Sequence, residues 1–382
     1  MTRTDGDSAH LRRALAESLA ELGALRSVPW REAVEAVPRE AFLRGGWFDA
    51  VPGSAPTAWR PVMPGSPGWL ERCYRDESLV TQVAGTIVPG DLRGEIMRTP
   101  TSSSTMPNLV VRMWEELRVE DGHRVLEAGT GTGYSTAMGC HRLGEEKIVS
   151  VEVDPELSAR AGVSLGACGF FPELVVGDAL AGVAGGHRFD RVISTCGVLT
   201  IPPAWIEQTR PGGIILATVC GWMYSSELAR LTVSEDGTAH GGFLGGRISF
   251  MLARPQLPPR LGMLPDLDAG DERAAVYGPD VLGDWTARFV SQIAAPRAQR
   301  VMLSVDSGQE RHVIIDVEAG AWAALTREGN RWTVRQGGPA RLWDDIEEHL
   351  TQWLADGSPG LEAFEILVTP EGQAITWPRC AG

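Results

Sequence analysis

One run of eleven residues constrains the fold more than any other part of the chain. Residues 124–134 spell Arg-Val-Leu-Glu-Ala-Gly-Thr-Gly-Thr-Gly-Tyr, with glycine at positions 129, 131 and 133. An apolar run of strand length thus enters a glycine turn, and a helical pattern follows. Glycine lets the backbone approach a ligand closely, and the start of a helix offers free N–H groups. The run predicts either a ligand-binding turn or only a tight strand-to-helix connection.

Short apolar or β-branched runs alternate with helical stretches around this turn. They lie at residues 124–128, 148–153, 174–176, 191–195 and 213–219. Strands that alternate with helices predict a mostly parallel α/β sheet, doubly wound with helices on both faces. Two further runs, 228–233 and 242–253, are separated by the turn at 235–237 and predict an antiparallel edge.

The remaining patterns divide the chain into regions. Helical periodicity predicts helices at 11–24, 30–37, 108–117 and 342–354, and apolar runs predict strands at 301–304, 312–317, 332–336 and 364–369. Prolines and glycines predict a long loop at 51–69. We therefore expect an N-terminal helical and loop region at 1–100 that contributes to the substrate pocket, a core at 101–253, a proline-rich linker at 254–273 and an α+β domain at 274–382.

Acidic residues follow the strands after the glycine turn. Glu152 ends its strand about 20 residues beyond the last glycine, where doubly wound folds place a carboxylate on ribose hydroxyls. The pair Gly177-Asp178 ends the third strand, in position to contact an adenine edge. The third glycine comes two positions after the second, whereas the dinucleotide fingerprint has three. This spacing disfavours a nicotinamide oxidoreductase.

Composition excludes several partners. Among 382 residues, Lys+Arg 35 against Asp+Glu 49 gives a net charge of −14, which disfavours nucleic acid and anionic membranes. Lys147 is the only lysine, so a Walker-type phosphate loop is absent. The six cysteines form no Cys-x-x-Cys pair, which predicts reduced thiols and no metal site. The polar residues 1–10 and the short apolar run 212–224 predict a cytoplasmic protein.

Several motifs together resemble the protein-L-isoaspartate O-methyltransferase family, over about residues 27–220. They are Val37-Pro-Arg-Glu-x-Phe42, Ser104-Thr-Met-Pro107, the run 125–134, Val176-Gly-Asp178, Thr195-Cys-Gly, Ile201-Pro-Pro-x-Trp205 and Pro211-Gly-Gly. The resemblance implies a class I, Rossmann-like methyltransferase fold with S-adenosylmethionine as cofactor. It implies that the cofactor is held by Glu127, Gly129, Thr130, Gly131, Gly133, Tyr134, Glu152, Asp178 and Ala179.

The same resemblance assigns the acceptor site to a run of hydroxyls. Thr105 takes the catalytic role, with Ser104 and Ser103 as neighbours. A carboxyl of pKa about 4 is already ionised at pH 7, so it needs positioning and no general base. Three alternatives stay open. The hydroxyl run could cap the helix that follows it, Glu127 could be a solvated carboxylate at a strand end, and Tyr134 could serve only in packing.

Two departures resemble a diverged branch of the family, found beside ribosomally made, modified peptides such as lanthipeptides and graspetides. They are Met106 between the hydroxyl residue and Pro107, after a longer Ser/Thr run, and the region beyond Arg254. The branch implies a modified, cyclised precursor peptide as substrate, methylated on an aspartyl side chain. The ester would close to a succinimide, which water opens to aspartate or isoaspartate.

Two further interpretations compete with this one: a general isoaspartate repair methyltransferase, and a non-catalytic peptide-binding protein that kept the cofactor fold. The C-terminal region holds six of the 13 tryptophans. They predict either a hydrophobic core or a peptide groove.

Overall fold

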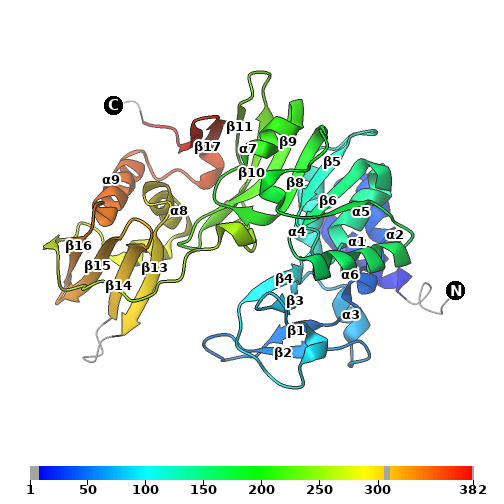
Figure 1. Ribbon diagram of the computed structural model, residues 1–382, viewed down its shortest axis with the longest axis horizontal. Coiled ribbons are helices and arrows are strands. Elements are labelled where there is room, and N and C mark those ends of the chain that lie inside the picture. The colour runs from blue at the N-terminus through cyan, green and yellow to red at the C-terminus, as the bar shows by residue number, and fades with distance from the viewer. Residues whose placement is uncertain (1–7, 305–309, 381–382) are drawn as a thin grey trace. The chain divides into compact units, whose positions relative to one another are not determined.

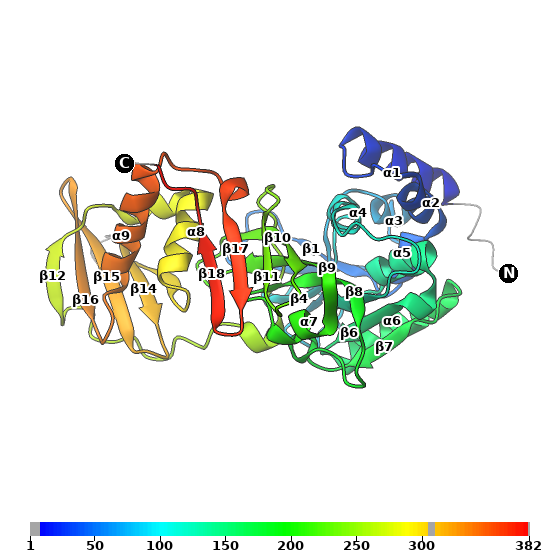
Figure 2. The same cartoon turned by 90° about the horizontal axis from the view of Figure 1, so that it is seen from above.

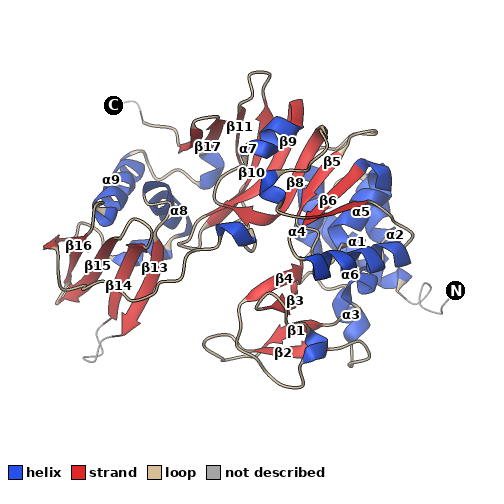
Figure 3. Ribbon diagram, viewed as in Figure 1, coloured by secondary structure: helices blue, strands red, loops and turns tan. Residues whose placement is uncertain are grey.

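The computed structural model describes residues 8–304 and 310–380, and helices alternate with strands along much of the chain (Figures 1 and 3). The chain forms two compact units. The first comprises Met1–Cys196, Pro202–Leu216 and Thr232–Gly237, and the second comprises Gly197–Ile201, Ala217–Leu231 and Thr238–Gly382. The second unit thus includes three stretches from the region that the sequence assigns to the core, at residues 197–201, 217–231 and 238–253.

The helices of the first unit are α1 (Ala9–Glu21), α2 (Val28–Ala36), α3 (Trp69–Cys73), α4 (Pro107–Glu116), α5 (Tyr134–Leu143), α6 (Pro155–Ala167) and α7 (Pro203–Gln208). Its 3-10 turns are η1 (Arg39–Leu43), η2 (Pro89–Asp91), η3 (Glu145–Lys147) and η4 (Ala179–Ala181). The leucine repeat of α1 buries Leu15 and Leu19. Trp30 of α2 and Trp114 of α4 pack with ring centroids 5.1 Å apart, which joins the N-terminal helices to the core.

A four-stranded antiparallel sheet precedes the core. Its strands are β1 (Trp47–Ala50), β2 (Trp59–Val62), β3 (Leu79–Val83) and β4 (Pro100–Ser104), in the order β2-β1-β3-β4. The expectation of an irregular loop across 51–69 is therefore wrong at β2. Pro61 fits this strand because β2 lies at the sheet edge, where a missing N–H breaks no ladder.

The main sheet is built around parallel strands. These are β5 (Val125–Ala128), β6 (Ile148–Glu152), β7 (Glu173–Val176) and β8 (Phe189–Val198). The neighbour of β8 on its other side is β9 (Thr209–Cys220). β5 pairs in parallel with β6 and β8, and β6 pairs in parallel with β7. The strands expected at 124–128, 148–153, 174–176, 191–195 and 213–219 are thus all present.

The full order of this sheet is β18-β17-β11-β10-β9-β8-β5-β6-β7. The added strands are β10 (Ser226–Val233), β11 (Ala239–Phe243), β17 (Glu365–Thr369) and β18 (Gly372–Thr376). A strand is expected at 242–253, but β11 ends at Phe243, ten residues before the end of the expected strand. Gly245, Gly246 and Arg247 have φ of 71°, 108° and 55°, and these left-handed conformations end the strand.

A second sheet belongs to the C-terminal region. Its strands are β12 (Asp271–Ala274), β13 (Gln299–Ser304), β14 (Glu310–Asp316), β15 (Ala321–Glu328) and β16 (Arg331–Gly337), in the order β12-β16-β15-β14-β13. Helix α9 (Leu342–Ala355) lies against β14, β15 and β16, and α8 (Trp285–Ala294) lies beside α9 (Figure 2). The short turns are η5 (Arg254–Gln256), η6 (Pro279–Gly283) and η7 (Leu361–Ala363).

The proline-rich stretch 254–273 lies within the second unit. Leu261, Leu264 and Leu267 pack on a cluster that includes Val313 and Trp322. This stretch therefore covers part of a core and enters the sheet at β12. Among the described residues, no helix combines the length and apolar character needed to cross a membrane.

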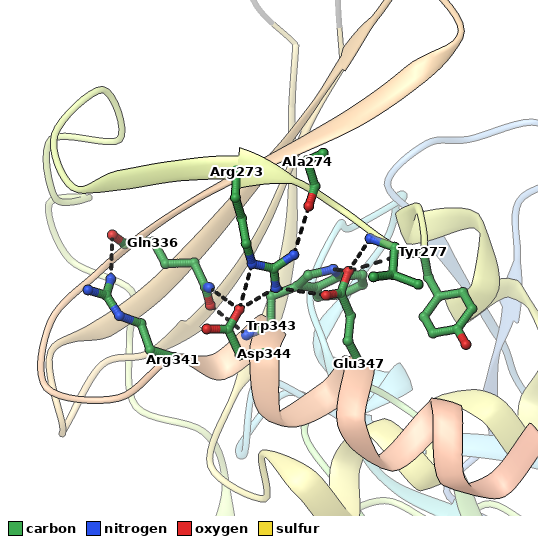
Figure 4. A network of polar contacts seen from close by, with 9 residues as sticks. Arg273, Ala274, Tyr277, Gln336, Arg341, Trp343, Asp344 and Glu347 are labelled. Atoms are coloured by element: carbon green, nitrogen blue, oxygen red, sulfur yellow. Dashed lines mark hydrogen bonds and ion pairs between the residues drawn. The ribbon is translucent and has the colours of Figure 1, made fainter.

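A polar network fastens β12 to α9 (Figure 4). Arg273 donates through Nε to Asp344, 2.9 Å, and its guanidinium also pairs with Glu347 at 2.7 Å. Glu347 in turn accepts from the indole N–H of Trp343, 2.9 Å. Trp343 is fully buried, and Trp322 and Trp353 are also buried, so these three tryptophans belong to the core.

Candidate active site

The turn between β5 and α5 needs glycine at all three of its positions. Gly129, Gly131 and Gly133 have φ of 97°, 54° and 90°, a region that other L-residues rarely adopt. A Cβ atom on Gly129 would also lie 2.7 Å from the Thr195 hydroxyl oxygen, which hydrogen-bonds the carbonyl of Ala128. The turn therefore needs glycine for its backbone conformation and, at Gly129, also for its close packing against Thr195 of β8.

Glu152 at the end of β6 reaches this turn. Its carboxylate is 7% exposed, and one oxygen accepts from the backbone N–H of Gly131 at 2.9 Å. The other oxygen accepts from the N–H of Asp154 at 3.1 Å. A carboxylate can accept about four hydrogen bonds, so Glu152 retains capacity for the hydroxyls of a ligand.

A buried network supports the turn from inside. Glu127 is 0% exposed, and one of its oxygens accepts from Thr136, 2.5 Å, and Ser150, 2.7 Å. The Ser150 hydroxyl shares a further hydrogen bond of 2.7 Å with Thr130 in the turn. Burial raises the pKa of Glu127, and hydroxyl donors oppose that rise. The alternative of a solvated strand-end carboxylate is therefore wrong.

The hydroxyl run crosses the glycine turn. Ser103 and Ser104 belong to β4, and a Cβ on Gly131 would lie 3.7 Å from the carbonyl oxygen of Ser103 and 3.9 Å from Oγ of Ser102. Ser104 is 1% exposed, and its hydroxyl has no hydrogen-bond partner within residues 8–304 and 310–380. The fold thus brings strand β4, which carries Ser103 and Ser104, next to the predicted cofactor turn.

The interpretation of this run as a helix cap is wrong. Helix α4 begins at Pro107, its N-cap position is Met106, and no side chain of the run bonds its first turn. Asp76 instead accepts from the N–H of Asn108 at 2.8 Å. Thr105 follows β4 and is partly exposed, and in the described part of the chain its hydroxyl makes no hydrogen bond.

The other predicted site residues differ in their surroundings. Asp178 is exposed and accepts from the N–H of Leu180, while the carbonyl of Ala179 accepts from the Trp205 indole at 2.7 Å. The pKa of the Cys196 thiol is raised to about 11, mainly by burial, and the negative charges of Glu152 and Asp178 contribute to the rise. Both carboxylates therefore lie within electrostatic range of Cys196.

Tyr134 packs into the protein interior. It is 2% exposed, and its ring meets Phe42 edge-on at 5.9 Å between centroids. Burial raises its pKa to about 12, so the phenol stays neutral. Sequence patterns alone also miss Ser102 and Gln82. Gln82 donates to Asp154 at 3.0 Å and thereby ties β3 to the end of β6.

Comparisons with known proteins agree on one family. The family model described as protein-L-isoaspartate(D-aspartate) O-methyltransferase matches residues 91–242. A protein-L-isoaspartate O-methyltransferase of Methanopyrus kandleri is 31% identical over 190 residues, which cover 46% of this chain and 83% of that protein. One of Ignicoccus hospitalis is 31% identical over 160 residues, which cover 40% of this chain and 76% of that protein.

A solved structure extends the likeness of fold. A chain titled protein-L-isoaspartate O-methyltransferase aligns with a TM-score of 0.56 at 21% identity, covering 96% of this chain and 99% of that chain. The class I methyltransferase fold predicted from the sequence is thereby confirmed. The alignment also reaches through the C-terminal region, so that region has a structural counterpart in a protein of this title.

Proposed function

Because this chain belongs to the protein-L-isoaspartate(D-aspartate) O-methyltransferase family, we propose that it methylates a carboxyl group of an aspartyl or isoaspartyl residue in a peptide. The single observation that carries the proposal is the passage of β4 over the glycine turn. It places the carbonyl of Ser103 and the hydroxyl of Ser102 beside Gly131, and Thr105 directly follows this strand.

The residues around the turn fit S-adenosylmethionine, the cofactor of the family, which when bound supplies an electrophilic methyl group on a sulfonium centre. The left-handed conformations of the three glycines give the turn a backbone shape that other residues rarely adopt. Glu152 is suited to accept from ribose hydroxyls, and Asp178 is suited to accept from the amino group of an adenine. Glu127 and Thr130 hold the turn in shape through Ser150.

The acceptor carboxylate needs orientation more than activation. At pH 7 it is ionised and nucleophilic, so no residue has to remove a proton. The Thr105 hydroxyl donates to the oxygen that does not attack, which leaves the other oxygen directed at the methyl group. Ser104 and Ser103 flank this position, and the unpaired hydroxyl of Ser104 is a second possible donor.

The product is a methyl ester, which is a better electrophile than the carboxylate it replaces. The next backbone nitrogen of the peptide attacks the ester carbonyl, expels methanol and forms a succinimide. Water then opens the ring to aspartate or isoaspartate. These later steps need no residue of the enzyme.

Calorimetry tests the cofactor assignment. We expect binding of S-adenosylmethionine and no binding of a nicotinamide dinucleotide, and Glu152→Ala should weaken binding because it removes the acceptor at the end of β6. A Glu152→Ala protein that binds as the wild type does would show that the site is elsewhere. Turnover of the cofactor by the wild type would exclude a non-catalytic peptide-binding protein.

The narrower proposal is that the substrate is a dedicated, ribosomally made and cyclised peptide, methylated on an ordinary aspartate. Its support is the hydroxyl run with Met106, which resembles the branch of the family that modifies such peptides. The names of the relatives favour the alternative, general isoaspartate repair. The C-terminal region favours neither substrate, because a solved structure titled protein-L-isoaspartate O-methyltransferase also aligns with this region.

Matched substrates distinguish the two. We expect a macrocyclic aspartyl peptide to be methylated faster than a linear isoaspartyl peptide of the same composition. A preference for the linear isoaspartyl peptide would establish the repair alternative.

A further inference from the structure

A buried arginine lies beneath the acceptor strand. Arg39 is 0% exposed and belongs to η1, within the motif Val37-Pro-Arg-Glu-x-Phe42. Burial lowers the pKa of its guanidinium, which nevertheless stays charged because arginine does not lose its proton in proteins. Burying a charged group away from water costs free energy unless other groups hydrogen-bond to it.

The guanidinium is engaged by main-chain carbonyls from two segments. In the described part of the chain it donates to the carbonyls of Cys73 at 3.0 Å, Arg75 at 2.9 Å and Glu77 at 2.9 Å. It also donates to the carbonyls of Ser104 at 3.2 Å and Thr105 at 3.1 Å. A single side chain thus joins the segment 73–77 to the residues that carry the acceptor hydroxyls.

Two more contacts fix the same stretch of backbone. The N–H of Met106 donates to the hydroxyl of Ser78 at 3.0 Å, and the N–H of Asn108 donates to Asp76 at 2.8 Å. Together with Arg39, these contacts hold the main chain on both sides of the Thr105 side chain. The hydroxyl itself remains available to a substrate.

Arg39 also touches the element that follows the glycine turn. Its Cζ atom lies 5.9 Å from the centroid of the Tyr134 ring, and Tyr134 is the first residue of α5. The guanidinium therefore lies between the start of α5 and the acceptor strand. Its two Nη atoms donate all five bonds, whereas its Nε–H has no partner among the described residues. A single ammonium group could not reach both segments from one point.

We propose that Arg39 is a positioning residue that sets the Thr105 hydroxyl relative to the glycine turn. The inference rests on the proposed function. Methyl transfer requires the carboxylate oxygen, methyl carbon and sulfur in line, so a displacement of the acceptor strand reduces the rate of transfer. Cofactor binding relies on other residues and stays intact.

The test compares Arg39→Lys with Arg191→Lys. Arg191 is a matched control because it is 8% exposed and donates to the carbonyls of Leu117, Arg118 and Asp190, away from the hydroxyl run. We expect Arg39→Lys to lower kcat about tenfold to a hundredfold, with the dissociation constant for S-adenosylmethionine within about twofold of wild type. Arg191→Lys should lower the melting temperature but keep kcat within about twofold.

A double variant shows whether Arg39 acts through Thr105. If it does, Arg39→Lys combined with Thr105→Ala is about as slow as the slower single variant, because both remove the same alignment. Multiplied effects, or equal kinetic losses in the Arg39 and Arg191 variants, would overturn the proposal.

If Arg39→Lys fails to fold, a milder variant tests the same proposal. Ser78→Ala removes an exposed hydroxyl that holds Met106 and should lower kcat by a smaller factor with cofactor binding unchanged. An unchanged kcat there would count against the positioning role. A wild-type protein that transfers no methyl group would contradict the proposed function itself, which is a different outcome from full activity in the Arg39 variants.

Discussion

The hydroxyl of Thr105 has a different environment from those of its neighbours. Ser102 and Ser104 are buried in β4, whereas Thr105 follows the strand and is partly exposed. Its main chain is held by Arg39, and its side chain has no competing partner among the described residues. Such a group is held in place yet free to bind, as an orienting donor must be.

Replacing Thr105 with alanine should slow methyl transfer without weakening cofactor binding. The loss of one hydrogen bond to a charged oxygen costs about 1.5–3 kcal/mol, roughly tenfold to a hundredfold in rate. Transfer rates and calorimetric affinities measure the two effects separately, and Thr105→Ser should retain most of the activity. An unchanged rate in Thr105→Ala, with Ser104→Ala slowed instead, would move the role to Ser104.

Glu127 should make the stability of the protein depend on pH. Burial raises its pKa in the folded state, so above the ordinary glutamate pKa of about 4.3 the unfolded chain loses the proton first. The free energy of unfolding therefore falls as pH rises from about 4.3 through the raised pKa. The side chain in the Glu127→Gln variant does not ionise, so its free energy of unfolding does not fall in this way. In denaturant titrations its stability relative to wild type should therefore increase with pH. A pH-independent difference would contradict a raised pKa.

The elements around the turn can be predicted because each is encoded locally. β5, β6 and β8 are apolar runs, and their alternation with helices implies the parallel order. β4 differs, since Pro-Thr-Ser-Ser-Ser lacks the pattern of a strand and is held by pairing with β3. Local sequence therefore suggests a helix cap where the fold has a strand. Only long-range pairing brings the hydroxyl run to the glycine turn.

The packing of α5 depends on a glycine within the helix. A Cβ on Gly139 would lie 2.8 Å from the ring of Trp114, which is fully buried against Trp30 and cannot move aside. Gly139→Ala should therefore destabilise the protein by about 1–3 kcal/mol, although alanine favours a helix by about 1 kcal/mol.

Gly166→Ala in α6 is the matched control for this prediction. Its Cβ would lie 3.4 Å from the ring of Phe171, which is 71% exposed and free to move. Thermal unfolding measures the stability of both variants. A Gly139→Ala protein at least as stable as wild type would show that α5 does not pack closely against Trp114.

At the scale of the whole molecule, the second unit is assembled from separate stretches of the chain. β17, near the C-terminus, pairs with β11, and the side chain of Gln292 in α8 bonds both backbone groups of Ser225 at 2.9 Å. Removing residues 274–382 would leave β11 and Ser225 without these partners. The truncated protein must therefore be shown to fold before any loss of activity can be assigned to substrate binding.

Gln292→Ala should show how firmly α8 is joined to the strands before it. The variant leaves the buried N–H of Ser225 unpaired, at about 1–3 kcal/mol. It also removes one of two hydrogen bonds to the Ser225 carbonyl, which still accepts from the N–H of Gly221 at 3.2 Å. Gln299→Ala, which removes one partly buried bond to Pro259, should cost less. Denaturant unfolding measures the free energy of unfolding of both variants. Equal losses of stability would mean that the Gln292 contacts stabilise the protein no more than the Gln299 contact does.

The most direct test of the account is the chemical form of the transferred methyl group. The wild-type protein would be incubated with S-adenosylmethionine and a mixture of linear and macrocyclic peptides that contain aspartyl and isoaspartyl residues. We predict that mass spectrometry finds one added methyl group on a carboxyl, and that mild alkali removes it, as it does an ester. An alkali-stable methyl group, or no transfer by a protein that binds the cofactor, would contradict the account.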